Sequence, residues 1–478
     1  MKLEDLHSVY FIGIGGIGMS AIARYLHSRG VRVAGYDRSC TALTRKLEAE
    51  GMKIHYEDRP DLLPQDTELV VYTPAVPDSL QELQQVRNSG LTLMKRSEVL
   101  GLISRGHKTL AVAGTHGKTT TSTMLTWLLA HAGMEPVAFL GGIGLNWQSN
   151  YVPGTGEWAV MEADEYDRSF LRLSPEMAAI LSVDPDHLDV YGDPGSMWES
   201  GFLAFAKSLP PGRTLFLPER LRSLFEGRLS GQEVISFGIG EGDYRAENLR
   251  VENGRFVFDM FLPESGALSL SKGEALSLSK GGALSLSKGD KLQNLSLLMA
   301  GRHNVENAVA ALAMALEAGM PLEAAAEGIA TFKGIKRRFE RVLEREDLVF
   351  IDDYAHHPTE LKAAISAARE LYPGRRITGL FQPHLYSRTR DFQRGFAEAL
   401  DALDEAVLLD IYPAREEPIP GVSSELISRQ MKKAGVPVLR KSEVTEYLKS
   451  HRPDVLMTLG AGDIDTLVEP IQQMFKQA

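Results

Sequence analysis

The sequence has a single cysteine, no long hydrophobic run and no excess of positive charge. Because Cys40 has no second cysteine to pair with, it cannot form a disulfide within the chain, which is typical of a reducing compartment. No apolar segment reaches the roughly 18 residues that a membrane-spanning helix needs, so we expect no membrane insertion. Acidic residues number 63 against 52 lysines and arginines, and the net charge of −11 gives no general attraction to nucleic acid. Any polyanionic ligand must therefore bind at a local site.

The start of the chain and the overall composition indicate a cytoplasmic globular protein. In "MKLEDLHSVYFIGIGG" acidic residues stand where a secretion signal would need positive charge, and a glycine-rich turn stands where it would need an apolar core. Hydrophobic residues make up 44% of the chain and charged residues 24%, which is ordinary for a soluble protein. At about 150 residues per domain, 478 residues suggest three domains.

Apolar strands alternate with helical stretches along most of the chain, which predicts an α/β fold. Residues 9–37 are predicted to form a strand, a glycine turn, a helix and a second strand. The pattern begins again after residues 101–109, which we expect to be a link, and a third time after "FKGIKRRFE". The predicted domains are 1–105, 106–331 and 332–478.

One segment interrupts this pattern. Between residues 267 and 290 the octad "ALSLSKG" plus one variable residue occurs three times without a break. Three such copies are far too short for a solenoid, so we expect a mobile surface insertion without a catalytic role. An interaction or self-association element is the alternative.

The first glycine-rich loop lies between a predicted strand and a predicted helix. Its G-x-G-x-x-G pattern lets the backbone approach a diphosphate at the helix N-terminus, and a carboxylate at the end of the next strand could bind ribose hydroxyls. Alone, this pattern would also suit a nicotinamide dehydrogenase or a tight turn without a ligand. The candidate residues are Gly13, Gly15, Gly16, Ile17, Gly18 and Asp37.

A second loop, "GTHGKTTT" at residues 114–121, resembles a phosphate-binding P-loop that has been shortened. Lys118 offers a point charge for phosphates, Thr119 a hydroxyl for Mg²⁺, and the backbone amides can surround phosphate oxygens. A dehydrogenase has no use for this second loop, and the chain lacks the Asn-Lys pair of a guanine-reading GTPase. The candidate ATP-binding residues here are Gly114, Thr115, His116, Gly117, Lys118, Thr119 and Thr120.

Two further strands end in acidic segments. "AVMEADEYDRSF" places Glu162 directly after an apolar strand, and "ILSVDPDHLDVYG" places His187 after another. Because the carboxyl ends of parallel strands share one edge of a sheet, this carboxylate and this imidazole could hold Mg²⁺ beside ATP. We interpret most of the neighbouring acids, which include Asp164, Glu165 and Asp167, as solvated loop residues.

Three segments later in the chain are ambiguous alone. His303 and Asn304 in "GRHNVENA" could contact a base or simply cap the following helix. His356 and the neighbouring histidine in "DDYAHHPTE" could form a proline-flanked turn, and "KGIKRR" is ordinarily a solvated basic face.

Taken together, these motifs resemble the Mur ligase family, from Val9 to the C-terminal "LGAGDI". The shortened loop "GTHGKTTT" is that family's own variant of the phosphate loop. Further family motifs follow in order: "GIGGIGMSAIA", "EADEYDRSF", "DHLDVYG", "GRHNVENA", "DDYAHHPTE" and "FQPHLYSRTRDF". The resemblance implies a Rossmann-like UDP-binding domain, a central ATPase domain and a Rossmann-like C-terminal domain.

The resemblance also implies an activity and its ligands. We expect ATP-dependent ligation of L-alanine to the lactyl carboxylate of UDP-N-acetylmuramate through an acyl phosphate, with Mg²⁺. The implied catalytic residues are Lys118, Glu162, His187 and His356; Thr119, Glu162 and His187 would hold metal. Further ATP contacts would be His303, Asn304, Asn307, Arg338 and Asp353, and the substrate side would comprise Tyr354, His384 and Arg388.

Two positions depart from the family pattern. Many members have arginine directly after the histidine of "FQPH", where this chain has Leu385, which weakens an amino-acid carboxylate contact there. Sister ligases that add later residues carry a carbamylated lysine at the position of Phe202, so we expect no such modification.

Three alternative functions stay open on sequence alone. A murein peptide ligase would join a recycled tripeptide to the same sugar nucleotide, and a nucleotide-sugar-binding protein could have lost catalysis. A nicotinamide oxidoreductase is the third. We expect a monomer or weak homodimer that binds neither nucleic acid nor membrane.

Overall fold

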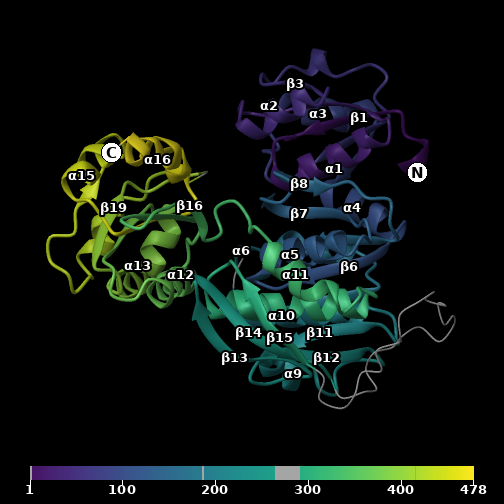
Figure 1. Cartoon of the computed structure of the whole chain (residues 1–478). Coiled ribbons are helices and arrows are strands. Elements are labelled where there is room, and N and C mark those ends of the chain that lie inside the picture. The colour runs from purple at the N-terminus through teal and green to yellow at the C-terminus, as the bar shows by residue number, and fades with distance from the viewer. Residues whose placement is uncertain (1–2, 186–187, 264–290, 415, 478) are drawn as a thin grey trace. The chain divides into compact units, whose positions relative to one another are not determined.

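The computed structural model describes residues 3–185, 188–263, 291–414 and 416–477 (Figure 1). His187 and the octad repeats at 267–290 lie outside the described residues. The rest divides into two compact units. The larger comprises Met1–Glu247, Asp259–Leu295 and Glu306–Phe332, and the smaller comprises Asn248–Phe258, Ser296–Val305 and Lys333–Ala478.

The chain begins with a five-stranded parallel sheet in the order β3-β2-β1-β4-β5. The predicted strand, glycine turn, helix and strand are confirmed as β1, α1 and β2. The strands are β1 (Ser8–Ile12), β2 (Arg32–Tyr36), β3 (Lys53–His55), β4 (Leu69–Tyr72) and β5 (Thr92–Lys95). The helices are α1 (Ile17–Ser28), α2 (Ala42–Ala49), α3 (Gln81–Ser89) and α4 (Arg96–Arg105).

The expected link at residues 101–109 is wrong. Helix α4 continues to Arg105, and β6 (Lys108–Ala113) begins three residues later. Val99, Leu100 and Ile103 are buried on one side of this helix, so its apolar spacing determines the structure more strongly than the glycine at position 101. The connection between α4 and β6 is therefore only two residues long.

Helix α1 packs against the second sheet as well as the first, next to β7 (Val137–Gly144) and β8 (Ser149–Val152) (Figure 1). The contact contains a buried polar cluster. Arg24 is paired with Glu50 at 2.7 Å and donates to the Oδ1 atom of Asn150, whose amide donates to Ser20 at 3.0 Å. The Arg24 side chain is 8% exposed and that of Glu50 is 40% exposed, so the ion pair adds little stability of its own and mainly orients the guanidinium towards Asn150. The helix that follows the first glycine loop is thus held from both sides.

The second sheet has ten strands in the order β15-β14-β13-β12-β11-β10-β6-β9-β7-β8. Its remaining strands are β9 (Trp158–Glu162), β10 (Met177–Ile180), β11 (Thr214–Pro218), β12 (Glu233–Ile239), β13 (Tyr244–Glu252), β14 (Arg255–Phe261) and β15 (Lys291–Leu297). The associated helices are α5 (Lys118–His131), α6 (Leu188–Tyr191), α7 (Pro194–Met197), α8 (Ala204–Ser208), α9 (Glu219–Phe225), α10 (Arg302–Glu317) and α11 (Ala324–Thr331).

The order of the central strands brings three sequence motifs together. Strand β6 pairs in parallel with β9 on one side and with β10 on the other. The second glycine loop follows β6, Glu162 ends β9, and the segment leading to His187 follows β10. Because parallel strands place their carboxyl ends at one edge, these segments begin from one edge of the sheet, as predicted.

The smaller unit contains a six-stranded sheet in the order β16-β17-β21-β18-β19-β20. All its pairings are parallel except that between β16 and β17. The strands are β16 (Glu340–Glu344), β17 (Val349–Asp353), β18 (Ile377–Phe381), β19 (Glu405–Leu409), β20 (Val438–Leu439) and β21 (Val455–Leu459). The helices are α12 (Pro358–Leu371), α13 (Tyr386–Leu400), α14 (Glu425–Ser428), α15 (Lys441–Ser450) and α16 (Val468–Gln477).

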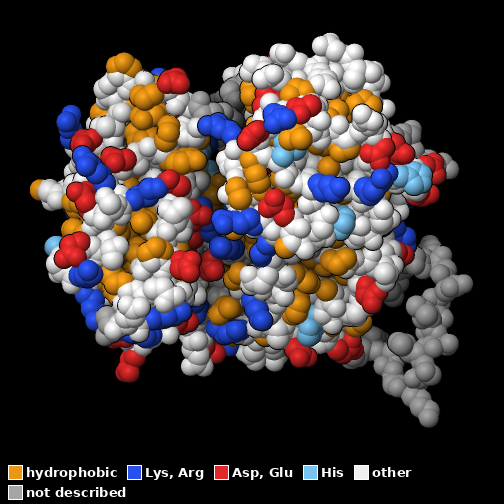
Figure 2. Space-filling model, turned by 90° about the horizontal axis from the view of Figure 1, so that it is seen from above, with side chains coloured by type: hydrophobic (Ala, Val, Ile, Leu, Met, Phe, Trp, Pro, Cys, Tyr) orange, Lys and Arg blue, Asp and Glu red, His pale blue; other side chains and the backbone are white. Residues whose placement is uncertain are grey.

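Basic and acidic side chains are interspersed over the face seen in Figure 2, with apolar side chains between them. This mixture agrees with the net charge and with the absence of any long basic stretch in the sequence. In the described part of the chain, no helix combines the length and apolar character needed to span a membrane.

Candidate functional site

The first glycine loop connects β1 to α1 and is tied to the end of β2. The Gly15 N–H donates to the Oδ2 atom of Asp37 at 2.7 Å, and the Ser39 N–H donates to its Oδ1 atom at 3.0 Å. A Cβ atom on Gly15 would lie 2.8 Å from the same carboxylate, so only glycine allows this approach. Ile17 begins α1 and Gly18 lies beside the Arg96 guanidinium, which places a helix N-terminus and a cation at this loop.

The second loop connects β6 to α5 through two residues with positive φ. Gly114 has φ +133° and Gly117 has φ +83°, where a side chain would strain the backbone. An added Cβ on Gly114 would lie 2.9 Å from the Ser182 amide nitrogen, and one on Gly117 would lie 2.5 Å from the Oδ1 atom of Asn307. Asn307 is buried in α10, so the loop is closely packed on two sides.

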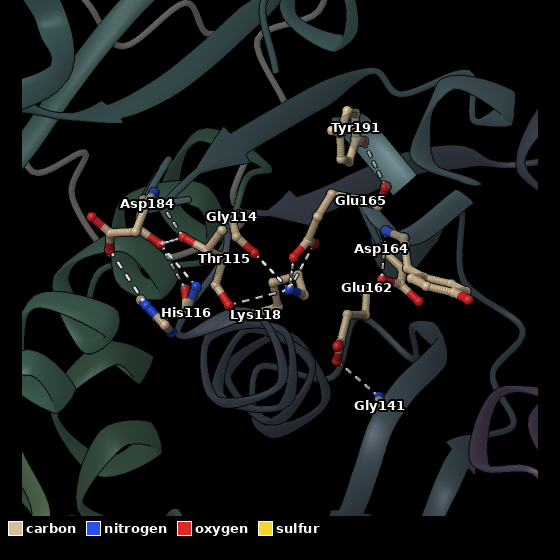
Figure 3. Close-up of polar contacts among 12 residues, drawn as sticks. Gly114, Thr115, His116, Lys118, Gly141, Glu162, Asp164, Glu165, Asp184 and Tyr191 are labelled. Atoms are coloured by element: carbon tan, nitrogen blue, oxygen red, sulfur yellow. Dashed lines mark hydrogen bonds and ion pairs between the residues drawn. The ribbon is translucent and has the colours of Figure 1, made fainter. Parts of the chain in front are cut away.

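Ser182 fixes the middle of this loop. The Thr115 N–H donates to the Ser182 carbonyl at 3.2 Å, and the His116 N–H donates to the Ser182 hydroxyl at 2.8 Å. The Thr115 and Ser182 hydroxyls are 2.9 Å apart, and the Asp184 N–H donates to the Thr115 hydroxyl at 3.0 Å. Figure 3 shows Thr115 and His116 facing Asp184 across these contacts. Sequence reasoning missed Ser182, because a lone serine after a strand carries no distinctive pattern.

Lys118 is the first residue of α5, and its ammonium turns back over the loop. It donates to the Gly114 carbonyl at 2.6 Å and lies 2.7 and 3.0 Å from the two carboxylate oxygens of Glu165 (Figure 3). Burial alone lowers the pKa of this ammonium, but the charges of Glu165 and its acidic neighbours outweigh burial and raise the pKa above its ordinary value. Lys118 is therefore a fixed cation beside the loop amides.

Glu162 ends strand β9 opposite the second loop. Its Oε2 atom accepts the Gly141 N–H of β7 at 2.9 Å, which orients the carboxylate (Figure 3). Within the described ranges no three acidic, cysteine or histidine residues form a metal-binding group. A single oriented carboxylate such as that of Glu162 suits Mg²⁺, which usually takes one or two protein carboxylates and completes its shell with water and substrate phosphates. Thr119, in the first turn of α5, supplies a hydroxyl as the second candidate ligand.

The interpretation of the neighbouring acids as solvated is wrong for Glu165. Its side chain is only 1% exposed, because it pairs with the Lys118 ammonium. Asp164 forms an ion pair with Arg96 at 3.4 Å, and Asp167 forms one with Lys95 at 2.8 Å. Spacing could not reveal these partners, since they lie 47 to 72 residues before the acids in the chain.

The remaining candidates in the larger unit either lie near the second loop or fall outside the described residues. Thr120 is buried in the first turn of α5, and Asn307 lies against Gly117. His187, predicted to bind metal, falls outside the described residues. The same motif does contribute Tyr191, whose hydroxyl donates to the Glu165 carbonyl at 2.6 Å.

In the smaller unit, His303 and Asn304 stand at the start of α10. The Asn304 amide donates to the Ala300 carbonyl at 2.7 Å, and this side chain is 3% exposed. That contact is a local bond from the side chain to the backbone carbonyl four residues earlier. A role in adenine binding stays a prediction for both residues.

Asp353 ends strand β17 and accepts two backbone amides, from Phe339 at 2.7 Å and from Ala355 at 2.8 Å. Burial raises the pKa of its carboxyl to about 6, although the Arg338 guanidinium and the two amides lower it. Arg338 also lies over the Tyr354 ring at 5.2 Å from its centroid. These three predicted residues are neighbours at one strand end.

His356 and His384 lie together in the same unit, with ring centroids 6.1 Å apart. Burial lowers the pKa of His356 below its ordinary value, while Glu360 opposes that shift and Arg388 of α13 adds to it. Leu385, which caps α13, has φ +71° and donates its N–H to the Tyr412 carbonyl at 2.9 Å. The predicted substrate-side residues are therefore close to one another in space.

Strand-end loops with a fixed lysine, a hydroxyl and an oriented carboxylate describe a site for nucleotide phosphates. Family models agree with this description along the chain. The Mur ligase catalytic domain model matches residues 8–108, the Mur ligase middle domain model matches 112–315, and the Mur ligase glutamate ligase domain model matches 337–462. The chain belongs to the Mur ligase family, and the predicted three-domain α/β architecture is confirmed.

Individual relatives are similar over nearly the whole chain. The UDP-N-acetylmuramate–L-alanine ligase of Porphyromonas gingivalis is 45% identical over 97% of this chain and 98% of its own length. The ligase of the same name from Phocaeicola vulgatus is 43% identical over 98% of each chain.

Solved structures give the same picture. The UDP-N-acetylmuramate–alanine ligase MurC of Thermotoga maritima superposes with a TM-score of 0.79 at 27% identity, over 98% of this chain and 99% of that one. A murein peptide ligase of Psychrobacter arcticus superposes with a TM-score of 0.70 over 99% of each chain, but at 22% identity it shows the shared fold alone.

Proposed function

We propose that this chain is an ATP-dependent ligase that joins L-alanine to the lactyl carboxylate of UDP-N-acetylmuramate. The products are UDP-N-acetylmuramoyl-L-alanine, ADP and phosphate, a step in the synthesis of peptidoglycan precursors. The supporting observation is that relatives named for this reaction are 41–45% identical over nearly full length. The loop with Lys118 and the strand end with Glu162, on adjacent parallel strands, provide the chemistry it needs.

The first step must activate a poor electrophile. ATP transfers its γ-phosphoryl group to the lactyl carboxylate, which gives an acyl phosphate and ADP. Repulsion between two anions opposes this transfer, and the Lys118 ammonium offsets it with a buried positive charge at the loop. The loop residues Gly114, Thr115, His116 and Gly117 would surround the phosphates, with Thr120, Asn307, His303, Asn304, Arg338 and Asp353 on the nucleotide side.

Mg²⁺ would be held by Thr119, Glu162 and His187. When bound, it neutralises charge on the phosphate oxygens. The carboxylate of Glu162 is already oriented for this role by the Gly141 amide.

In the second step, the neutral amine of L-alanine attacks the acyl phosphate, and the tetrahedral intermediate expels phosphate to leave the amide. A depressed pKa keeps the His356 imidazole neutral near pH 7, so it is suited to accept a proton from the amine. Tyr354, His384 and Arg388 would line the substrate side. Water must be excluded throughout, because it would hydrolyse the acyl phosphate.

The first glycine loop would bind the UDP part of the sugar nucleotide. Gly13, Gly15, Gly16, Ile17 and Gly18 would face the diphosphate, and Asp37 would bind the ribose while it holds the Gly15 amide. We also propose that the enzyme acts in the cytoplasm, where both nucleotides are available, as a monomer or weak homodimer. The domain boundaries 1–105, 106–331 and 332–478 are part of the same proposal.

The deciding experiment measures phosphate release from ATP and Mg²⁺ with UDP-N-acetylmuramate, using L-alanine, the tripeptide or no acceptor, and checks the product mass. We expect release, and a mass gain of one alanine residue, only with L-alanine. Turnover with the tripeptide alone would instead identify a peptide-recycling ligase. No turnover with either acceptor would favour a nucleotide-sugar-binding protein.

A further inference from the structure

The pair formed by Lys118 and Glu165 has a consequence beyond the proposed reaction, although it rests on the ATP-binding role proposed for Lys118. We infer that Glu165 is a positioning residue whose carboxylate takes the place of a phosphate group on Lys118 while the site is empty. ATP must then displace this carboxylate from the ammonium. Glu165 thereby lowers the affinity for ATP and keeps Lys118 charged and oriented until ATP arrives.

The contacts of the ammonium support this inference. The ammonium donates to the Gly114 carbonyl at 2.6 Å, to the Thr115 carbonyl at 3.4 Å and to the Oε1 atom of Glu165 at 3.0 Å, which accounts for its three hydrogens. The Oε2 atom of Glu165 lies 2.7 Å away as an ion-pair contact. The Lys118 side chain is 13% exposed and that of Glu165 is 1% exposed. A phosphate oxygen at this ammonium therefore needs one of these acceptors to give way. The Gly114 and Thr115 carbonyls belong to the loop backbone, which leaves the carboxylate as the acceptor that can be exchanged.

Glu165 itself is held firmly behind the loop. The Tyr191 hydroxyl donates to its backbone carbonyl at 2.6 Å (Figure 3). Two and three residues further on, Asp167 and Arg168 both have φ +53°, a conformation that non-glycine residues adopt only when their surroundings impose it. Phe170 follows in the same segment. It is buried, and its ring stacks on that of Phe205 with the ring centroids 4.8 Å apart. This support keeps the carboxylate within reach of Lys118.

Electrostatics give the direction of the effect. A buried ammonium without a partner is strongly disfavoured, so the empty site is stabilised by a carboxylate that the occupied site does not need. Removing that charge destabilises the empty site selectively and lessens repulsion of the incoming polyphosphate. Neutralisation of Glu165 should therefore tighten ATP binding, whereas loss of an ordinary structural residue would weaken it.

The test is calorimetric titration of the full chain with ATP in EDTA, so that no metal contributes. For Glu165→Gln we expect Kd to fall about tenfold relative to wild type, as expected for loss of a nearby competing charge. The matched control is Asp167→Asn. It removes the same charge two residues further along the chain, from a side chain that is paired with Lys95. Its Kd should stay within about twofold of wild type, because a half-exposed pair contributes little.

Unchanged or weaker ATP binding by a folded Glu165→Gln protein would overturn the inference. Equal tightening by Asp167→Asn would overturn it too, since the effect would then be one of general charge. Thermal unfolding checks that each variant is folded. Should Glu165→Gln not fold, Glu165→Asp keeps the charge but withdraws it by one methylene, and it should tighten binding by a smaller factor; no tightening would count against the inference.

Steady-state kinetics separate this role from a merely structural one. For Glu165→Gln we expect a lower KM for ATP without a higher kcat, whereas general loosening of the site would raise KM. The two proposals also fail separately. A wild-type protein that makes product while Glu165→Gln fails to tighten ATP binding would refute only the inference, and a wild-type protein that binds no ATP would refute the proposed function itself.

Discussion

The two glycine loops of the larger unit have the same local architecture but different polar surroundings. Each follows a parallel strand and opens a helix, α1 in one case and α5 in the other. In the first loop a carboxylate, Asp37, accepts a backbone amide of the loop itself. In the second loop a carboxylate, Glu165, accepts from the side chain of a buried lysine. The two loops therefore differ in the group that donates to the carboxylate, which is a backbone amide in the first loop and a lysine ammonium in the second.

This difference corresponds to two kinds of phosphate chemistry. A diphosphate that is only held needs backbone amides and a helix N-terminus, both of which are fixed in place. A phosphate that is transferred changes its charge distribution during reaction, and a side-chain cation can follow that change. We therefore expect Asp37 to remain in its site when ligand binds and Glu165 to be displaced.

Among the variants that compare the two loops, replacement of Lys118 should have the largest effect on activity. We expect Lys118→Ala to lower kcat by about a thousandfold or more, because transition-state charge loses its cation. Binding of UDP-N-acetylmuramate, measured by calorimetry, should be unchanged because it uses the other loop. Preserved turnover would remove the distinction between the two loops.

A glycine substitution in each loop tests the backbone. Gly117→Ala places a side chain at φ +83° against Asn307, which should cost about 1–3 kcal/mol and raise KM for ATP. Its counterpart Gly16→Ala has φ −61° and no neighbour nearer than 3.4 Å to the added carbon, so its thermal midpoint should match wild type. Thermal unfolding of both variants makes the comparison. Equal losses would show that the two backbones are equally constrained.

Removal of the Asp37 carboxylate should weaken ligand binding at the first loop, whereas removal of the Glu165 charge should tighten ligand binding at the second. We expect Asp37→Ala to raise the Kd for UDP-N-acetylmuramate about tenfold, because the Gly15 amide loses its acceptor. The affinity for ATP should not change. Asp78→Ala, an exposed aspartate paired with Arg87 in the same sheet region, is the control. Tighter sugar-nucleotide binding would mean that Asp37, too, is displaced.

Asp353 extends the comparison to a third carboxylate, also bonded to backbone amides, and has the smallest expected effect. Its pKa is raised to about 6, so its ionisation costs native stability as pH rises from about 4 towards 6 and above. Asp353→Asn cannot ionise, although it loses one amide acceptor. The thermal midpoint of the variant minus that of wild type should therefore increase between pH 4.5 and 7.5. A constant difference across that range would indicate an ordinary carboxyl pKa.

The sequence was sufficient to predict most of the fold. Short apolar strands between helical stretches predicted the parallel sheets, and glycines at positions 133 and 319 marked the ends of α5 and α10. The exception was residues 101–109, which were expected to form a link, whereas residues 101–105 belong to helix α4 and Ile103 is buried. Burial of the helix against neighbouring elements outweighed the local preference, and a single sequence does not show which residues such packing will bury.

For the site, the sequence determined which groups are present, and the tertiary structure decided what each one contacts. A glycine-lysine-threonine run after a strand identifies a phosphate loop because the backbone conformation and the charge are local properties. The partners of that loop, Glu165, Ser182 and Asn307, lie 47 residues or more after Lys118 in the chain and carry no pattern of their own. The order of β9, β6 and β10 in the sheet brings Glu165 and Ser182 to the loop, and α10 brings Asn307, because hydrogen bonds and ion pairs act over a few ångströms in space and take no account of distance along the chain.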